Sequence, residues 1–295
     1  MAETKYSRTN KVIIVGTVAE VDTNERTTAD GRKYVNGKVV IKSVIQDKEN
    51  LFDVKVLAFE KTSTGAVSSL YSSYVSLPSM LGKRIRVTGD LREGSFVTPD
   101  GQLRQFNEIY GRFFNVVRAD EADCANFEYS GFVVKSIYKR TNRDEEIIGY
   151  RLDVAQANYS GTNMQVVRFD IDKNDMHIVQ AIESAYEVGQ TVKFNGVISH
   201  ISRIETREEQ VSFGEPVVKQ FVTTEKVYRI TSGNEPFSED DPTYYPQEVI
   251  TSLVAEYKKS NAARIEEAKK AAEPAQPDND IARMTRTSGL TKSLL

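Results

Sequence analysis

The feature that most constrains this chain is an order of elements that occurs twice. Residues 11–117 contain five runs rich in Val, Ile, Phe and Tyr, with a helical pattern between the third and the fourth. Residues 127–230 repeat that order. LFDVKVLAFEK and NMQVVRFDIDK occupy equivalent positions in the two halves, as do the first-strand glycines Gly16 and Gly131. Two copies of one order predict two copies of one small fold.

The runs predict ten strands and two internal helices. The strands are 11–21, 34–45, 51–60, 83–92 and 104–117, then 127–138, 147–157, 164–172, 191–200 and 217–230. Helices are expected within 68–81, limited by Pro78, and over 174–189, with Asn174 as N-cap and Gly189 just past the end. This is the strand order of an OB-fold, a five-stranded Greek-key barrel. The predicted fold class is therefore all-β with minor α, as two consecutive OB-fold barrels.

Charge and composition predict the domain boundaries. Residues 1–118, in which basic residues outnumber acidic ones, form the first and main binding barrel. Residues 119–124 (ADEADC) form an acidic linker, and 125–232 form an accessory second barrel. Residues 233–295 supply an acidic linker, an amphipathic helix over 246–273 and a disordered tail. Pro246 suits the first position of that helix.

Several function classes are disfavoured. One cysteine, Cys124, excludes an internal disulfide, and two histidines argue against a metal centre. No apolar run reaches the ~18–20 residues of a membrane span, and the N-terminus lacks a signal-peptide core. No P-loop, zinc-protease or nucleophile-elbow motif occurs. We expect a cytoplasmic, non-enzymatic protein that needs no cofactor and no metal.

Alternation along the strands places basic and aromatic side chains together on the outward face of the first barrel. Cations attract phosphates, and flat rings stack on unpaired bases, so this face is predicted to bind single-stranded nucleic acid. Phe96 shares the face only if Gly94 introduces no bulge. The predicted binding residues are Tyr34, Lys38, Lys42, Lys55, Phe59, Arg84, Arg86, Arg92 and Phe96.

Two alternatives stay open for this face. The charges could be ordinary solvated residues, and the rings could belong to the core if a bulge shifts the alternation. Residues 27–38 and 93–104 are expected to be loops that clasp an oligonucleotide, with the Asn36–Gly37 pair as a turn signal. In the second barrel the equivalent outward residues alternate in sign, which predicts weaker binding; they are Arg151, Asp153, Arg168, Asp170 and Lys193.

Three segments resemble the bacterial-type single-stranded DNA-binding proteins. RTNKVIIVGTVAEVD (8–22) is similar to the first strand of that family, DVKVLAFEK (53–61) to the third, and KRIRVTGDLREGSF (83–96) to the fourth. The matching residues are Asn10, Lys11, Val12, Gly16, Phe59, Gly89, Leu91, Arg92 and Phe96. The resemblance covers about residues 8–118, with a degenerate second copy to about 232. It implies that Phe59 and Phe96 stack on DNA, and that the protein coats and protects single strands in replication, recombination or repair.

The chain also departs from that family. Two barrels in one chain favour a monomer or dimer, although a larger homo-oligomer stays open. The end, TSGLTKSLL, lacks the acidic tip of the family, so docking of replication or recombination proteins would fall to the rest of the C-terminal region. These departures favour a phage-encoded version acting in a bacterial host. The alternatives are an OB-fold protein-interaction or virion module that uses helix 246–273, and a protein that binds single-stranded RNA.

Overall fold

The first half of the chain closes into a five-stranded barrel. The computed structural model describes residues 8–62, 64–142, 144–158, 160–209 and 217–272, with side chains in β9 and β10 described only up to Ser202 and from Thr223. The strands are β1 (Asn10–Thr27), β2 (Lys33–Ile45), β3 (Lys48–Phe59), β4 (Arg84–Val97) and β5 (Leu103–Val116). They are hydrogen-bonded in the order β2-β3-β5-β4-β1, and β1 pairs with β2 to close the circuit. Within this barrel, β3 and β5 pair in parallel.

The second half repeats this topology. Its strands are β6 (Cys124–Thr141), β7 (Ile147–Ala157), β8 (Met164–Ile171), β9 (Thr191–Glu209) and β10 (Val217–Gly233). The order β6-β7-β8-β10-β9 is closed by pairing of β6 with β9, and β8 and β10 are parallel. Each half therefore has the strand order of an OB-fold, as the repeat predicts.

A helix follows the third strand in both halves. In the first, α1 (Ser69–Val75) is capped by the Ser68 side chain, and the 3-10 turn η1 (Leu77–Met80) follows at Pro78. In the second, α2 (Met176–Ala185) begins after Asp175 rather than after the expected Asn174, because the Asn174 amide bonds the Asp172 side chain in a turn. Both helices lie where the sequence predicts them.

The C-terminal helix α3 (Gln247–Ala272) packs on the second barrel. Its first half places Ile250 and Leu253 against buried side chains of β6, β7 and β8. Pro246 lies just before the helix and accepts a hydrogen bond from the Ile250 amide. No helix in the described part of the chain is long and apolar enough to cross a membrane. The predicted disordered tail lies outside the described residues.

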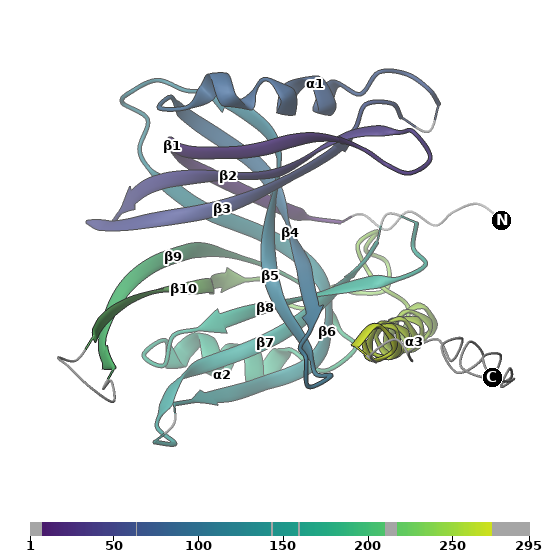
Figure 1. The fold of residues 1–295 in the computed structure, drawn as a ribbon. Coiled ribbons are helices and arrows are strands. Elements are labelled where there is room, and N and C mark those ends of the chain that lie inside the picture. Colours follow the sequence, from purple (N-terminus) through teal and green to yellow (C-terminus); the bar gives the residue numbers. More distant parts are fainter. Residues whose placement is uncertain (1–7, 63, 143, 159, 210–216, 273–295) are drawn as a thin grey trace, which may run out of the picture.

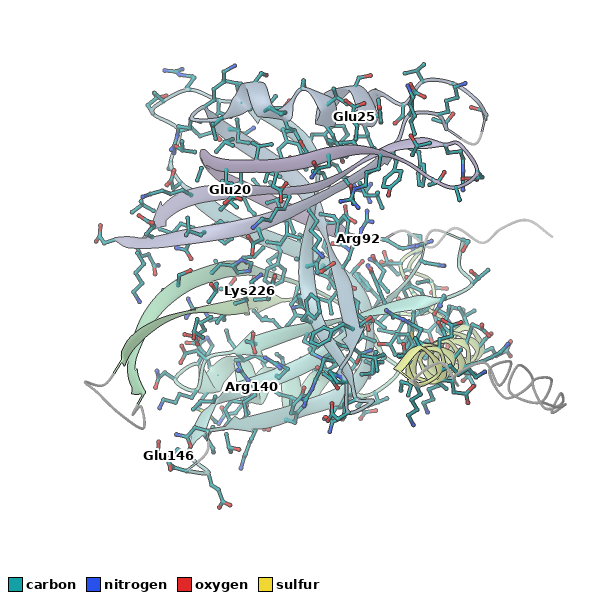
Figure 2. All side chains as sticks on the ribbon, in the orientation of Figure 1. Glu20, Glu25, Arg92, Arg140, Glu146 and Lys226 are labelled. Carbon is teal, nitrogen blue, oxygen red and sulfur yellow. The ribbon has the colours of Figure 1, made fainter. Side chains whose placement is uncertain are left out.

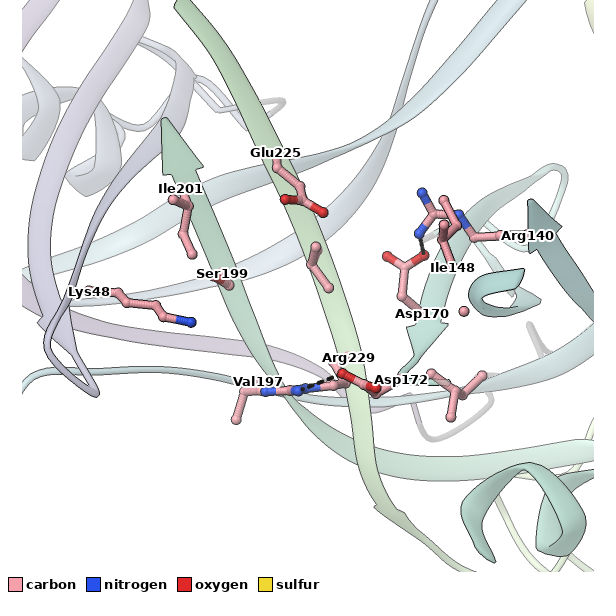
Figure 3. Close-up of a pocket in the computed structure, with 13 residues that line it drawn as sticks. Lys48, Arg140, Ile148, Asp170, Asp172, Val197, Ser199, Ile201, Glu225 and Arg229 are labelled. Carbon is pink, nitrogen blue, oxygen red and sulfur yellow. Dashed lines mark hydrogen bonds and ion pairs between the residues drawn. The ribbon is translucent and has the colours of Figure 1, made fainter. Parts of the chain in front are cut away.

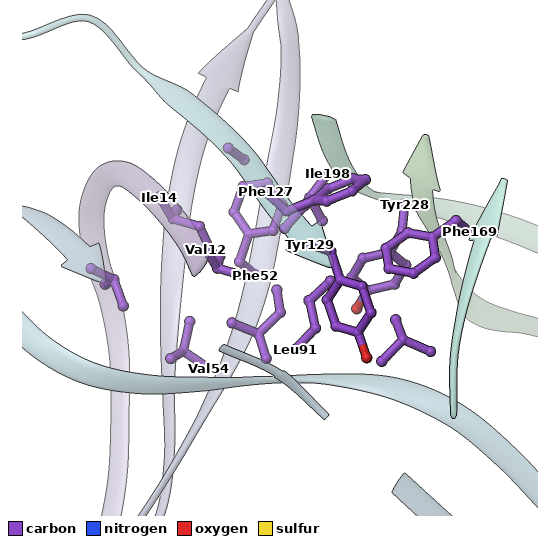
Figure 4. Close-up of a cluster of buried hydrophobic side chains, with 14 of the residues drawn as sticks. Val12, Ile14, Phe52, Val54, Leu91, Phe127, Tyr129, Phe169, Ile198 and Tyr228 are labelled. Carbon is purple, nitrogen blue, oxygen red and sulfur yellow. The ribbon is translucent and has the colours of Figure 1, made fainter. Parts of the chain in front are cut away.

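The two barrels share one hydrophobic core. β1 pairs with β6 over six residue pairs, from Asn10–Tyr129 to Val15–Cys124. Buried side chains of both barrels form a single cluster across this junction, and Figure 4 shows Val12 and Phe52 of the first barrel near Phe127 and Tyr129 of the second. The barrels are therefore joined by main-chain hydrogen bonds and by apolar packing.

The predicted loop 93–104 is mostly strand. β4 and β5 continue to Val97 and Leu103, so only residues 98–102 form a turn, and the hairpin crosses the second barrel in front of β8 (Figure 1). We call residues 92–107 the β4–β5 arm. Likewise, β1 and β2 reduce the predicted loop 27–38 to residues 28–32. The expected Asn36–Gly37 turn is wrong, because Gly37 pairs with Thr23 inside the β1–β2 ladder.

Side chains of the arm cover an open edge of β8. β10 pairs with β8 at one position, Arg229 with Asp170. On that edge of β8, the backbone amides that precede Asp170 therefore have no partner in a neighbouring strand. The Val166 amide donates to the Glu93 carboxylate at 2.8 Å, and the Arg168 amide donates to the Asn107 side chain at 3.0 Å. These polar side chains thus accept hydrogen bonds that a neighbouring strand would otherwise accept.

Candidate nucleic-acid interface

Two of the predicted rings form a pair at one end of the first barrel. Tyr34 of β2 lies opposite Phe59 of β3, with ring centroids 5.6 Å apart. The guanidinium of Arg32 lies 5.1 Å from the centre of the Phe59 ring, and Phe59 is 38% exposed. Their neighbours Val35 and Ala58 are buried, so alternation turns the pair outward. An exposed ring beside a cation can stack on a base and attract its phosphate.

The middle of the same face is charged. Arg92 of β4 lies over the Tyr110 ring of β5, with its guanidinium carbon 4.1 Å from the centroid. The Asp90 side chain is only 5% exposed and accepts hydrogen bonds from Arg92 at 2.7 Å and from Arg112 at 2.6 Å. Two guanidinium groups on one carboxylate leave net positive charge here. Figure 2 shows Arg92 and Lys226 in the zone where the barrels approach each other.

Phe96 lies on the outward side of the arm. The β4–β5 register runs without a shift from Gly89 to Phe96, so Gly94 introduces no bulge and the alternation holds. Phe96 is 53% exposed, and its ring centroid lies 6.0 Å from that of Phe106, which is 40% exposed. The strand registers place Phe96 roughly 33 Å from Phe59 along the strands. The structure therefore brings Tyr34 and Phe59 together and leaves Phe96 in a second aromatic pair.

All six predicted cations are held by carboxylates of the same chain. Exposed ion pairs contribute only about 0–1 kcal/mol, so a phosphate can replace the partners of Lys38, Lys42 and Arg86 at little cost. The other three carboxylates are largely buried and stay with the protein; they are Glu108, Asp123 and Asp90, with side chains 9%, 15% and 5% exposed. The pairs are Lys38–Asp53 at 3.8 Å, Lys42–Glu49, Lys55–Glu108, Arg84–Asp123, Arg86–Glu121 at 2.7 Å and Arg92–Asp90 at 2.7 Å.

Arg84 and Arg86 lie apart from the rings. Arg84 donates to the Glu121 carbonyl at 3.1 Å and pairs with Asp123, whose carboxylate also accepts the Val44 amide. Arg86 donates to the Glu121 carboxylate. Arg84 is thus bound into the segment that joins the barrels, whereas Arg86 is half exposed. A binding role for either residue stays a prediction.

Three exposed residues of β5 extend the face beyond the predicted set. They are Phe106, Arg112 and Phe113. Phe106 could have been found from the sequence, because positions 104, 106, 108 and 110 alternate with the buried Ile109. Arg112 could not, since the register shift between Thr88 and Gly89 is what brings it to Asp90.

A family model described as YorF matches residues 8–271. The chain belongs to the YorF family. No curated protein matches this YorF-family chain.

Among solved structures, the chain is similar to the single-stranded DNA binding protein from Thermus aquaticus. A deletion mutant of that protein has 11% identity and a TM-score of 0.49, over 81% of this chain and 97% of the other. The wild type has 12% identity and a TM-score of 0.48, over 78% and 94%. A Plasmodium falciparum SSB complex with ssDNA has 14% identity and a TM-score of 0.28, over 39% and 99%. Likenesses this weak do not show a function for the YorF-family chain.

A pocket of the second barrel in this YorF-family chain has balanced charges. It has a volume of about 330 Å³ and lies between β8 and the β9–β10 hairpin (Figure 3). Its walls hold two internal ion pairs, Arg140–Asp170 at 2.7 Å and Arg229–Asp172 at 3.4 Å. Within the described residues, no group of three or more His, Cys, Asp or Glu side chains could hold a metal ion. Nothing in this pocket favours a phosphate.

The two histidines and the cysteine are placed away from the face. His200 is buried between the barrels, 5.1 Å from Phe52 by ring centroids, and its Nε2 lies 3.1 Å from the Tyr228 hydroxyl. Burial lowers the pKa of His200 to about 3, helped by the nearby Lys226 charge. Burial raises the pKa of the Cys124 thiol, which suppresses the reactive thiolate. His177 is exposed on α2.

Proposed function

We propose that this protein binds single-stranded DNA, largely without regard to sequence, on the outward face of its first barrel. The observation that carries the proposal is the exposed Phe59 ring, paired with Tyr34 and flanked by the Arg32 guanidinium. Lys38, Lys42, Lys55, Arg86 and Arg92 hold phosphates along the face in this proposal, and Phe96 stacks further along.

The chemistry favours unpaired strands. A duplex hides the faces of its bases, whereas a single strand offers them to an aromatic ring. Each stacked base contributes about 1–3 kcal/mol and every base has such a face, so binding tolerates any sequence. Coating and protection of single strands in replication, recombination or repair follows as the proposed role. Docking of partner proteins on the C-terminal region and assembly of several copies stay predictions.

The test is a titration of labelled oligothymidylate (dT20), oligouridylate (rU20) and a matched 20-base-pair duplex at several salt concentrations. We expect tight binding of dT20, weak binding of duplex, and affinity that falls as salt rises. Equal affinity for duplex would indicate nonspecific charge attraction. Absence of dT20 binding at low salt would favour a protein-interaction module, and preference for rU20 would favour RNA.

A further inference from the structure

A small pocket lies where the arm of the first barrel meets the second barrel. Its volume is about 140 Å³, below the ~300–1,000 Å³ of pockets that take whole small molecules. Residues of the arm that line it include Phe106, and residues of the second barrel include Arg151, Arg168 and Lys226. Asp170 also lines the space, so three cations face one carboxylate. The remaining positive charge beside an exposed ring suits a phosphate and its neighbouring base.

The Arg168 guanidinium is fixed but incompletely partnered. Its backbone is held by both polar atoms of the Asn107 side chain, at 2.6 and 3.0 Å. One terminal nitrogen, Nη2, donates to Gln105 at 2.7 Å, and the other, Nη1, is buried without a hydrogen-bond partner among the described residues. A buried charged donor without a partner is costly, so this nitrogen needs an acceptor that the described side chains do not supply.

Two of the three cations that line the pocket already have carboxylate partners. Asp170, which also lines the pocket, accepts hydrogen bonds from Arg151 and from Arg140, and Asp53 pairs with Lys226 at 3.1 Å. Asp153 lies opposite Arg168 in the β7–β8 ladder and accepts the Tyr138 hydroxyl at 3.2 Å. Among the described residues, Arg168 has no ion pair. It is therefore the cation of this pocket that is most available to an anion.

We propose that this pocket binds one backbone phosphate of the single strand, held by Arg168, while the adjoining base stacks on Phe106. This inference rests on the proposed function and extends it: the second barrel takes part in binding through a site built by both barrels. In this proposal, the bound DNA strand runs from the Tyr34–Phe59 pair over Arg92 and onto the arm. The alternating charges on the outward face of the second barrel predict weak binding there. Arg168 is an exception, because among the described residues it has no carboxylate partner to cancel its charge.

The experiment compares dT20 affinity and its salt dependence for the full chain and three variants. Arg168→Gln should weaken binding about tenfold and reduce the slope of log affinity against log salt by ~0.7, the value for one single-strand phosphate. Arg168→Lys should keep that slope. Phe106→Ala should weaken binding about fivefold with the slope unchanged. Lys259→Gln, on the exposed side of α3, is the control and should bind like the natural chain.

The outcomes separate this inference from the proposed function. If the natural chain and Lys259→Gln bind dT20, and Arg168→Gln and Phe106→Ala bind equally well with the natural slope, the pocket is not a subsite and the proposed function stands. If Arg168→Gln fails to fold, Phe106→Ala decides alone, and natural affinity in it overturns the inference. If the natural chain does not bind dT20, both fail together.

Discussion

Phe52 and Phe59 of β3 show how one strand gives the same residue type two roles. Seven positions separate them, so they point to opposite sides of the barrel wall. Phe52 is fully buried against His200, whereas Phe59 faces outward beside Tyr34. The sequence predicts this difference, because alternation within 51–60 is unbroken. It does not predict that a histidine from the second barrel covers Phe52.

His200 makes stability depend on pH. Because the pKa of His200 is lowered to about 3 in the folded protein, the unfolded chain binds a proton first as pH falls below about 6.5. Stability from the neutral ring is complete above pH 6.5 and is lost progressively below it, by about 2 kcal/mol between pH 6.5 and 5. Urea unfolding at these pH values should show this loss in the natural chain and in His177→Asn, but not in His200→Asn. An unchanged pH slope in His200→Asn would contradict this role.

Among the elements, the acidic segment between the barrels competes with DNA for Arg86, which is predicted to bind a phosphate. Glu121 holds Arg86 through two nitrogen donors. Glu121→Gln should free Arg86 and raise dT20 affinity about threefold, with a salt slope steeper by ~0.7. Glu146→Gln, in the β6–β7 loop, serves as the matched control. A Glu121→Gln variant with natural affinity and slope would place Arg86 outside the binding face.

The ten strands and three α-helices of the described residues could be predicted from hydrophobic periodicity and turn signals, and most of their bounds agree within a few residues. The arm could not. Glu93 lies in the predicted loop 93–104, whereas Gln105 and Asn107 lie in the predicted strand 104–117. The sequence does not show what these three polar residues contact, because their partners Val166, Arg168 and Tyr257 lie far away in sequence. For the same reason, the shared position of Arg168 and Phe106 at one pocket is not visible in the sequence. The binding residues predicted from the sequence stay a prediction.

At the scale of the whole molecule, the shared core predicts cooperative unfolding. Phe127 of β6 packs 5.1 Å from Phe169 by ring centroids, in the cluster that continues into the first barrel. Calorimetry should show one transition in which the calorimetric and van't Hoff enthalpies agree. Phe127→Ala should lower the stability of that single transition by about 3–5 kcal/mol. Two separate transitions, with only one shifted by Phe127→Ala, would show that the barrels unfold independently.

In the proposed function, the exposed Phe59 ring on the first barrel stacks on unpaired bases. The most direct measurement pairs dT20 affinity with the free energy of unfolding for Phe59→Ala. We predict a loss of about 1–3 kcal/mol in binding and less than ~1 kcal/mol in stability, because Phe59 is exposed. Phe52→Ala, on the opposite face of the same strand, should instead lose about 3–5 kcal/mol of stability. Natural dT20 affinity in a folded Phe59→Ala variant would contradict the claim.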